Sequence, residues 1–266
     1  MMRRVSLEIR DQVAYATMVR GEKYNGLDWD MFIGLVETAR KIRKDRSIRA
    51  VILQGEGRAF STGLDVASFF GQPFKAVRIF LKYGIKSTNL AQEAAWCWRR
   101  LPVPVIAVLH GRCYGGALQI ALAADFRFAT PDCEFSIMEI KWGLIPDMTG
   151  SITLRELMPI DQAKRLTMTG ELFNGERAKA LNLVTEVSDD PLAMAEALAD
   201  QIKSRSPDAV GAAKALFQKT WTASARRALS LESGLQLRMF RSRNQRVALK
   251  AGMAKEAPVF ESRQFD

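Results

Sequence analysis

Apolar and polar residues alternate along two stretches near the start of the chain, Val5–Ile9 and Gln12–Val19. Strict alternation is typical of a half-buried strand, and Arg10-Asp11 between the two stretches is suited to a turn. We therefore expect a β-hairpin at one edge of a sheet.

The segment that follows has the spacing of an amphipathic helix. Asp28 is a suitable N-cap, and the apolar positions of this helix continue to about Lys44. A longer helical stretch is expected from about Phe74 to Arg100, where a proline-containing tripeptide stops it.

In the rest of the chain, the pattern of apolar residues predicts short strands first and helices later. Apolar runs predict strands at Ala50–Gln54, Val105–Leu109, Phe126–Ala129, Glu134–Met138 and Leu183–Val187. Helical spacing predicts a short helix ending at Leu122, helices around Glu196–Gln201 and Ala209–Gln218, and one long helix from Ala223 to Met253. Strands alternate with helices over the first part, so we expect an α/β core in residues 1–200 and a helical C-terminal region in residues 201–266.

The composition is that of a soluble globular protein, with 48% hydrophobic and 26% charged residues, which excludes wholesale disorder and a polytopic membrane protein. No window approaches the roughly 18–20 uninterrupted apolar residues of a membrane span. The three cysteines form no C-x-x-C pair, and the single histidine, His110, leaves no room for a multi-histidine zinc site. We expect a cytoplasmic protein without a bound metal.

The charge balance is unusual. The 39 Lys and Arg residues against 29 Asp and Glu give a net charge of +10, which favours an anionic partner. Nucleic acid, a membrane surface and a phosphorylated small molecule all meet this condition, and charge alone does not choose among them.

Two glycine-containing loops follow buried strands, Ala59–Asp65 and Gly111–Ala117, and the second opens directly onto a helix. Glycine lets the backbone approach a ligand closely, and a helix start offers free N–H groups. Two such amides from separate loops can converge on one oxygen and form an oxyanion hole. Glycines between a strand and a helix also occur in ordinary turns. Neither loop fits a Walker P-loop or G-x-G-x-x-G.

Taken together, the two loops resemble those of the crotonase (enoyl-CoA hydratase/isomerase) superfamily. Supporting stretches extend the resemblance over nearly the whole chain: Ala124–Ala129, Phe135–Glu139, Gly143–Pro146, Leu166–Gly170, Ala178–Val187 and Pro258–Phe260. The resemblance implies a crotonase-like spiral of ββα units with a helical C-terminal trimerisation region. It also implies an acyl-CoA substrate, in which coenzyme A is part of the substrate, no permanently bound cofactor, and a homotrimer or dimer of trimers.

The resemblance assigns roles residue by residue. It implies that Ser61 and Gly116 supply the two oxyanion N–H groups. The family's first catalytic acid stands three residues after the second oxyanion residue, which is Gly116 here, and its second acid stands twenty residues further on. These positions are Gln119 and Glu139 in this sequence. The second acid is present, but the first is an amide, which orients a water without exchanging a proton at neutral pH.

The amide at position 119 changes the expected reaction. Hydration uses two carboxyl groups on one water, whereas a double-bond shift in this family runs with a single glutamate. Asp147 stands where dienoyl-CoA isomerase-like members carry an aspartate. We therefore expect isomerisation, with Glu139 as proton shuttle, Asp147 as second carboxyl and Gln119 as positioning group. The simpler alternative for Glu139 is a solvated glutamate at a strand end, and for Asp147 it is a turn residue after proline.

Other residues of the motifs are expected to bind the substrate, namely Ala59, Thr62, Gly63, Leu64 and Gly115. Phe69, Phe70 and Trp142 lie beside the motifs and are candidates for an acyl pocket, although aromatic residues at helical spacing more often belong to the core. Asp65 is expected to cap the following helix, and His110 to be structural.

Several functions stay open at this point. Besides an isomerase, we consider a hydratase proper, a CoA-thioester binder with little catalysis, and an RNA-binding crotonase. Basic residues gather in segments 40–49 and 226–250, where a solvated surface is the simplest explanation because aromatic residues are not interleaved for base stacking. Nucleic acid is therefore an unlikely partner, and the C-terminal cluster is a candidate for the phosphates of coenzyme A, across a subunit boundary.

Overall fold

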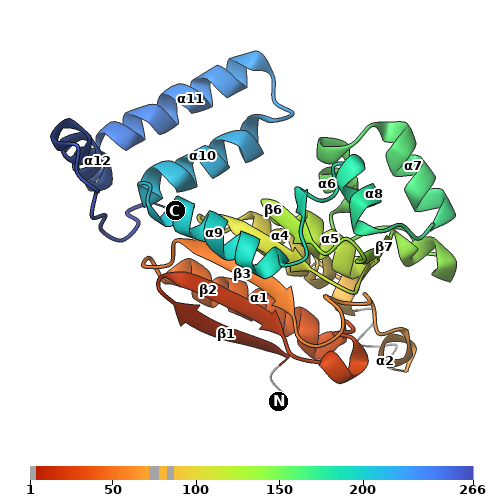
Figure 1. The fold of residues 1–266 in the computed structure, drawn as a ribbon. Coiled ribbons are helices and arrows are strands. Elements are labelled where there is room, and N and C mark those ends of the chain that lie inside the picture. Colours follow the sequence, from red (N-terminus) through yellow and green to blue (C-terminus); the bar gives the residue numbers. More distant parts are fainter. Residues whose placement is uncertain (1–3, 72–77, 83–86, 266) are drawn as a thin grey trace.

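The computed structural model describes residues 4–71, 78–82 and 87–265. Within them, the centre of the fold is a six-stranded sheet (Figure 1). Its strands, in spatial order, are β1 (Val5–Arg10), β2 (Val13–Met18), β3 (Ala50–Gly55), β4 (Val105–Leu109), β6 (Phe126–Ala129) and β8 (Glu186–Val187). The first two strands pair antiparallel, with Val5 opposite Met18, so the expected hairpin is confirmed. The other pairs are parallel, and β5 (Arg112–Tyr114) and β7 (Glu134–Ser136) form a second small sheet.

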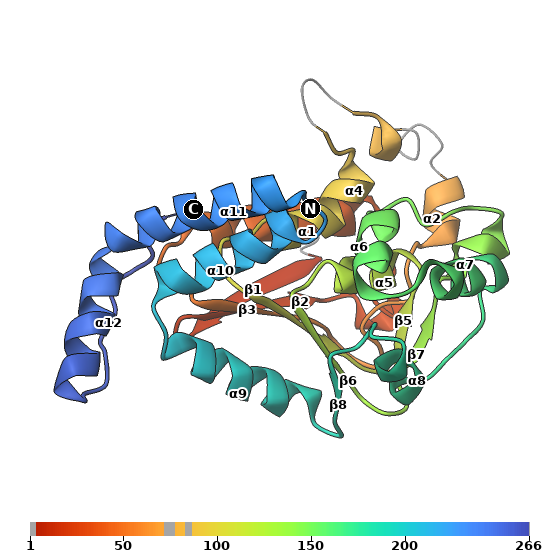
Figure 2. The ribbon, with the colours of Figure 1, turned by 90° about the horizontal axis from the view of Figure 1, so that it is seen from above.

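Helices cover both faces of the central sheet, as Figure 2 shows. On one face α1 (Trp29–Lys44) packs on α4 (Leu90–Arg99), and on the other α9 (Pro191–Lys203) contacts β3, β4 and β6. Side chains alternate accordingly: Leu53 belongs to the core cluster under α1, and Ile52 to the one under α9. The strands are thus buried on both faces, as parallel strands usually are, and the α/β class is confirmed.

The remaining helices surround one end of the sheet or form the C-terminal region. Near the sheet end lie α2 (Val66–Phe70), α5 (Gly116–Leu122), α6 (Gly150–Leu157), α7 (Ile160–Thr169) and α8 (Gly175–Ala180), with two 3-10 turns, η1 (Gly21–Lys23) and η2 (Met138–Trp142). The C-terminal region holds α10 (Pro207–Thr220), α11 (Ala225–Phe240) and α12 (Arg243–Ala254). No helix in the described part of the chain is long and apolar enough to cross a membrane.

Asp28 caps α1 as expected, because its side chain accepts a hydrogen bond from the Met31 N–H at 2.8 Å. The helix expected from Phe74 to Arg100 is interrupted in its described part. Residues 78–80 are helical, but residues 81–82 and 87–88 are not, and a second helix begins at Leu90, where Asn89 forms a capping box with Gln92. Part of that expected helix lies outside the described residues.

The single helix expected from Ala223 to Met253 is also wrong, because the chain breaks between α11 and α12 at Ser242. Ser242 is extended and caps α12, and its hydroxyl donates a 2.6 Å hydrogen bond to the buried Asp208 carboxylate. The same carboxylate accepts from the Asn244 side chain and from the backbone of Gln264. One buried acid therefore ties three separate parts of the C-terminal region together. The division at residue 200 stays a prediction, since α9 runs across it.

The strand expected at Glu134–Met138 ends early, at Ser136, and the chain turns into η2. The strand expected at Leu183–Val187 is reduced to Glu186–Val187, because the Leu183 carbonyl is turned toward the buried Arg127 guanidinium and accepts from its Nε at 2.7 Å. The first difference bears on function, since it changes how Glu139 is held.

Candidate active site

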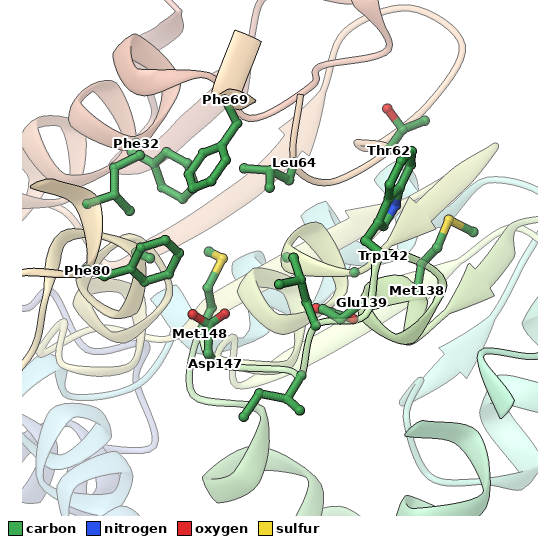
Figure 3. Close-up of a pocket in the computed structure, with 16 residues that line it drawn as sticks. Phe32, Thr62, Leu64, Phe69, Phe80, Met138, Glu139, Trp142, Asp147 and Met148 are labelled. Atoms are coloured by element: carbon green, nitrogen blue, oxygen red, sulfur yellow. The ribbon is translucent and has the colours of Figure 1, made fainter. Parts of the chain in front are cut away.

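A cavity of about 340 Å³ lies at the end of the sheet, between the loops after β3 and β5 and the segment that contains η2 (Figure 3). Its described lining residues are Phe32, Thr62, Leu64, Phe69, Ile79, Phe80, Ala91, Gly115, Gly116, Met138, Glu139, Trp142, Leu144, Ile145, Asp147 and Met148. The lining is almost entirely apolar, with two carboxyl groups set into it. An apolar cavity with a few convergent polar groups is the usual form of a small-molecule site.

The two glycine loops lie against each other beside this cavity. Ser61 bridges to Cys113, its N–H donates to the Arg112 carbonyl at 3.0 Å, and its carbonyl accepts from the Tyr114 N–H. Gly63 has φ +80°, and a Cβ there would lie 2.5 Å from the Tyr114 carbonyl oxygen. Glycine is therefore required at position 63 for the loops to approach so closely.

Two backbone N–H groups remain free where the loops meet. No acceptor among the described residues takes the N–H of Leu64 or of Gly116, and both residues line the cavity. Gly116 is the first residue of α5, so its N–H also carries the partial positive charge of a helix start. This arrangement suits an oxygen atom that becomes negatively charged.

Ser61, which the sequence assigned to this role, does not fit it. Its N–H is already bonded to Arg112, it is fully buried, and it does not line the cavity. Its side-chain hydroxyl donates to the Asn25 carbonyl and accepts from the Gly63 N–H, so it braces the loop instead. In the structure Leu64, and not Ser61, therefore has the free N–H beside that of Gly116.

Glu139 enters the cavity from the first turn of η2. Its Oε1 accepts a 2.6 Å hydrogen bond from Gln119 Nε2, whereas its Oε2 is buried without a hydrogen-bond partner in the described structure. A Cβ on Gly115 would be 3.5 Å from the Glu139 carboxyl carbon, so this carboxyl lies directly against the glycine loop. An unsatisfied buried carboxyl oxygen is costly to stability and is typical of a functional group.

Gln119 holds this arrangement from behind the cavity. Its Oε1 accepts from the backbone N–H groups of Met148 at 2.8 Å and Gly150 at 2.9 Å. This fixes the orientation of the amide, because its nitrogen must then point to Glu139. Gln119 therefore links Glu139 to the loop that carries Asp147, while it does not line the cavity itself.

Both carboxyl groups hold their protons more tightly than usual. Burial raises the pKa of Glu139, and the nearby Asp147 carboxylate raises it further, whereas backbone and Gln119 hydrogen bonds act in the opposite direction. Burial likewise raises the pKa of Asp147. Paired carboxyls with raised pKa values are suited to acid–base chemistry near neutrality.

This raised pKa predicts a pH-dependent stability effect of Glu139→Gln. Above the ordinary pKa of a glutamate, the unfolded chain loses the proton that the native state still holds, so native stability falls as the pH rises to the raised native value. Glu139→Gln removes that loss. We expect its thermal midpoint to exceed that of the wild type at pH 8 and the difference to shrink at pH 4, measured by circular dichroism.

The matched control is Glu176→Gln, because Glu176 is exposed on α8. Its midpoint should follow the wild type at both pH values. A Glu139→Gln midpoint that stays at or below the wild type at pH 8 would show that the charged carboxylate is not destabilised by its surroundings.

The structure brings most of the expected site residues together. Thr62, Leu64, Gly115, Gly116, Phe69, Trp142, Glu139 and Asp147 line the cavity, and Gly63 and Gln119 support it from behind. Ala59 lies elsewhere: it is fully buried, and its carbonyl accepts from the Asn25 side chain at 2.9 Å. The side chain of Phe70 lies outside the described residues.

The minor expectations also have outcomes. Asp65 caps α2 by accepting from the Ser68 N–H at 3.1 Å, as expected, and it also pairs with Arg20. The His110 ring is held by a 3.0 Å hydrogen bond between its Nε2 and the Gly57 carbonyl. Among the described residues no three potential metal ligands lie together, and the expected absence of a bound metal stays a prediction.

Sequence reasoning missed several lining residues. Phe32 comes from α1 and Phe80 from a distant segment, and neither stands near a recognisable motif. Leu144, Ile145 and Met148 flank the Pro-Asp pair, and their apolar character beside a candidate carboxyl was the available signal.

Comparisons with known proteins agree with this geometry. The family model described as enoyl-CoA hydratase/isomerase matches residues 8–263. The chain is 32% identical to (E)-benzylidenesuccinyl-CoA hydratase of Thauera aromatica, over 79% of this chain and 80% of the relative. It is 32% identical to the mitochondrial Delta(3,5)-Delta(2,4)-dienoyl-CoA isomerase of Mus musculus, over 76% and 64%. A crystal structure of enoyl-CoA hydratase from Bacillus anthracis superposes with a TM-score of 0.88 at 25% identity, over 97% and 98%.

Proposed function

This chain belongs to the enoyl-CoA hydratase/isomerase family and has its crotonase fold, and on that premise we propose that it shifts a carbon–carbon double bond in an acyl-CoA thioester. One observation carries the proposal. The free Oε2 of Glu139 is buried in an apolar cavity that also presents the two free N–H groups of Leu64 and Gly116. A base beside an oxyanion hole is the equipment for forming a thioester enolate.

In the proposed reaction, the thioester carbonyl oxygen accepts hydrogen bonds from the N–H groups of Leu64 and Gly116. Glu139 Oε2 takes a proton from the carbon between the carbonyl and the double bond, and the electron pair moves into the conjugated enolate. The negative charge on oxygen is stabilised by the two fixed N–H dipoles. The protonated Glu139 then returns the proton to the far end of the conjugated system, so that the double bond moves and no atom is gained or lost.

Gln119 supports isomerisation over hydration in this proposal. Its amide group is fully engaged with Glu139 and with the Met148 and Gly150 backbone, and it has no proton to exchange at neutral pH. A water molecule attacking the double bond would therefore meet an amide at position 119, where a hydratase has its other acid. Gln119 acts as a positioning residue.

Asp147 is the proposed second carboxyl. In Figure 3 it lies on the Phe80 side of the cavity, whereas Glu139 lies nearer Trp142. The two groups thus face different parts of a bound acyl chain, and Asp147 is placed to assist proton return at a carbon further from the carbonyl. Burial raises the pKa of Asp147, which favours the protonated form that this step uses.

Coenzyme A is proposed as part of the substrate, with no permanently bound cofactor. A second hollow is lined by Tyr24, Glu56, Gly57 and Arg58 among others, and the Tyr24 carbonyl accepts a hydrogen bond from the N–H of Thr62, which lines the cavity. We assign the nucleotide portion of coenzyme A to this hollow, where the Tyr24 ring, with the Arg112 guanidinium 5.4 Å from its centroid, is the candidate stacking surface.

The C-terminal basic cluster is harder to connect to this site. It lies on α11 and α12, at the opposite end of the molecule from α2 and α5 (Figure 2). Within one chain it does not reach the cavity, so its proposed contact with coenzyme A phosphates requires a neighbouring subunit. The homotrimer or dimer of trimers, the cytoplasmic location and the absence of a nucleic-acid partner remain proposals.

The decisive experiment compares 3-enoyl-, 3,5-dienoyl- and 2-enoyl-CoA substrates in one spectroscopic assay. We expect turnover of a 3-enoyl or 3,5-dienoyl thioester and at least about 10-fold slower hydration of the 2-enoyl compound. Hydration as the fastest reaction would make the chain a hydratase proper. Tight acyl-CoA binding with no turnover would support the second candidate, a CoA-thioester binder, which the missing acid at position 119 favours.

A gain-of-function variant tests the role of Gln119 directly. Gln119→Glu places an acid at the position where a hydratase has one and keeps oxygen acceptors for the Met148 and Gly150 N–H groups. We expect the ratio of hydration to isomerisation to rise at least about 10-fold, measured as kcat/KM on the two substrates. The conservative variant Gln119→Asn keeps the amide and should not raise that ratio. An unchanged ratio in Gln119→Glu would show that another feature selects the reaction.

A further inference from the structure

One end of the cavity is built from aromatic side chains. Phe69 and Phe80 form a T-shaped pair with ring centroids 5.9 Å apart and an interplanar angle of 77°. Phe32 is almost fully buried and lines the cavity with them. Figure 3 draws these three rings together at one end, with Thr62 and Trp142 at the other end.

The carboxyl groups lie between these two ends, so the aromatic end is the part of the cavity furthest along a bound acyl chain. Among the described residues, Ile79 and Ala91 add aliphatic wall to this end. Glu139 and Asp147 carry the only charges among the described residues that line the cavity. The aromatic end itself therefore offers hydrocarbon contacts to whatever the acyl group places there.

Two aromatic rings attract each other more strongly than the burial of their surfaces alone explains, because the positive edge of one ring faces the negative face of the other. The Phe69–Phe80 pair already has this edge-to-face geometry. An aromatic ring of the acyl group that binds beside this pair can add the same edge-to-face contact. A saturated group of equal size contributes only the free energy of burying its apolar surface. The difference corresponds to a preference of about 3- to 10-fold in affinity.

We propose that the natural substrate class is an acyl-CoA whose acyl group ends in an aromatic ring or an equally flat conjugated hydrocarbon, bound against Phe69 and Phe80. This inference rests on the proposed function, since it names the acyl group of the same thioester. A linear alkyl chain is the competing occupant.

The test uses two unreactive probes that differ only at the ring, 3-phenylpropanoyl-CoA and 3-cyclohexylpropanoyl-CoA. Isothermal titration of the full-length protein should show the phenyl compound binding about 3- to 10-fold more tightly. In Phe69→Leu, which keeps an apolar side chain, that preference should fall to within about 2-fold while the cyclohexyl compound keeps its affinity. Phe80→Leu should act in the same direction.

Phe126→Leu is the matched control, because Phe126 lies on β6, packs on the α9 side of the sheet and does not line the cavity, so its preference should equal that of the wild type. Equal affinity of the wild type for both probes, or tighter binding of octanoyl-CoA than of either, would overturn the inference. These outcomes leave the proposed function standing. Failure of every acyl-CoA to bind would instead contradict the proposed function itself.

Discussion

Glu139→Gln is expected to lower the kcat of double-bond isomerisation by about 1000-fold or more. Glutamine has nearly the same shape, and its carbonyl oxygen can keep the hydrogen bond from Gln119 Nε2, so the cavity should be preserved. What it lacks is an oxygen that takes up a proton and returns it. The measurement is steady-state turnover together with the Kd of a saturated acyl-CoA, which should change less than about 3-fold because binding does not use the proton transfer.

Glu176→Gln again serves as the matched control and should retain wild-type turnover, since Glu176 is exposed on α8 away from the cavity. If Glu139→Gln kept more than a tenth of the wild-type kcat, another group would have to be the base. Asp147, the other carboxyl in the cavity, would then be the first residue to substitute.

Removal of the Leu64 N–H is expected to lower kcat by about 100- to 1000-fold. Replacing Leu64 by its α-hydroxy acid changes the amide to an ester, which deletes this one donor and keeps the side chain. The N–H has no acceptor in the described structure, so its loss should leave the thermal midpoint nearly unchanged. The measurement is kcat alongside that midpoint.

The same amide-to-ester change at Ser61 is the informative comparison. There the deleted N–H donates to the Arg112 carbonyl, so we expect a lower thermal midpoint and a much smaller effect on kcat. The opposite pattern, with kcat sensitive at Ser61 and insensitive at Leu64, would restore Ser61 as the oxyanion donor.

The two positions illustrate how far the sequence leads. Glycines after buried strands located both loops and predicted that free N–H groups would converge there. Which N–H stays free depends on tertiary pairing, because Ser61 is taken up by Arg112 on a strand some fifty residues later in the sequence. No local pattern around Leu64 distinguishes its N–H from that of Ser61.

Gln119 shows a similar limit. The sequence revealed an amide in place of an acid, and so the expected change of reaction. It did not reveal that the amide oxygen accepts two backbone N–H groups beside Asp147 and thereby ties the loops of both carboxyls together. Likewise, Phe32 on α1 and Phe80 from a separate segment meet at the cavity through tertiary packing, which periodicity does not report.

The C-terminal region differed from expectation for a comparable reason. The helical periodicity from Ala223 to Met253 was real, but a buried hydrogen bond from Ser242 to Asp208 interrupts it. The sequence contains both residues, 34 positions apart, without any sign that they meet. Local propensity predicted the elements, and long-range polar contacts decided where they end.

We propose above all that Glu139 removes the α-proton of a bound acyl-CoA and that the two free N–H groups stabilise the resulting thioester enolate. The most direct test of this claim is exchange of the α-proton of a saturated acyl-CoA in heavy water, followed by mass spectrometry for the wild type and Glu139→Gln. This readout does not depend on where a double bond would move. We predict that the wild type introduces deuterium at the α-carbon far faster than buffer, and that Glu139→Gln exchanges at the buffer rate. A wild type that binds the thioester without exchange, or a variant that exchanges as fast as the wild type, would contradict the claim.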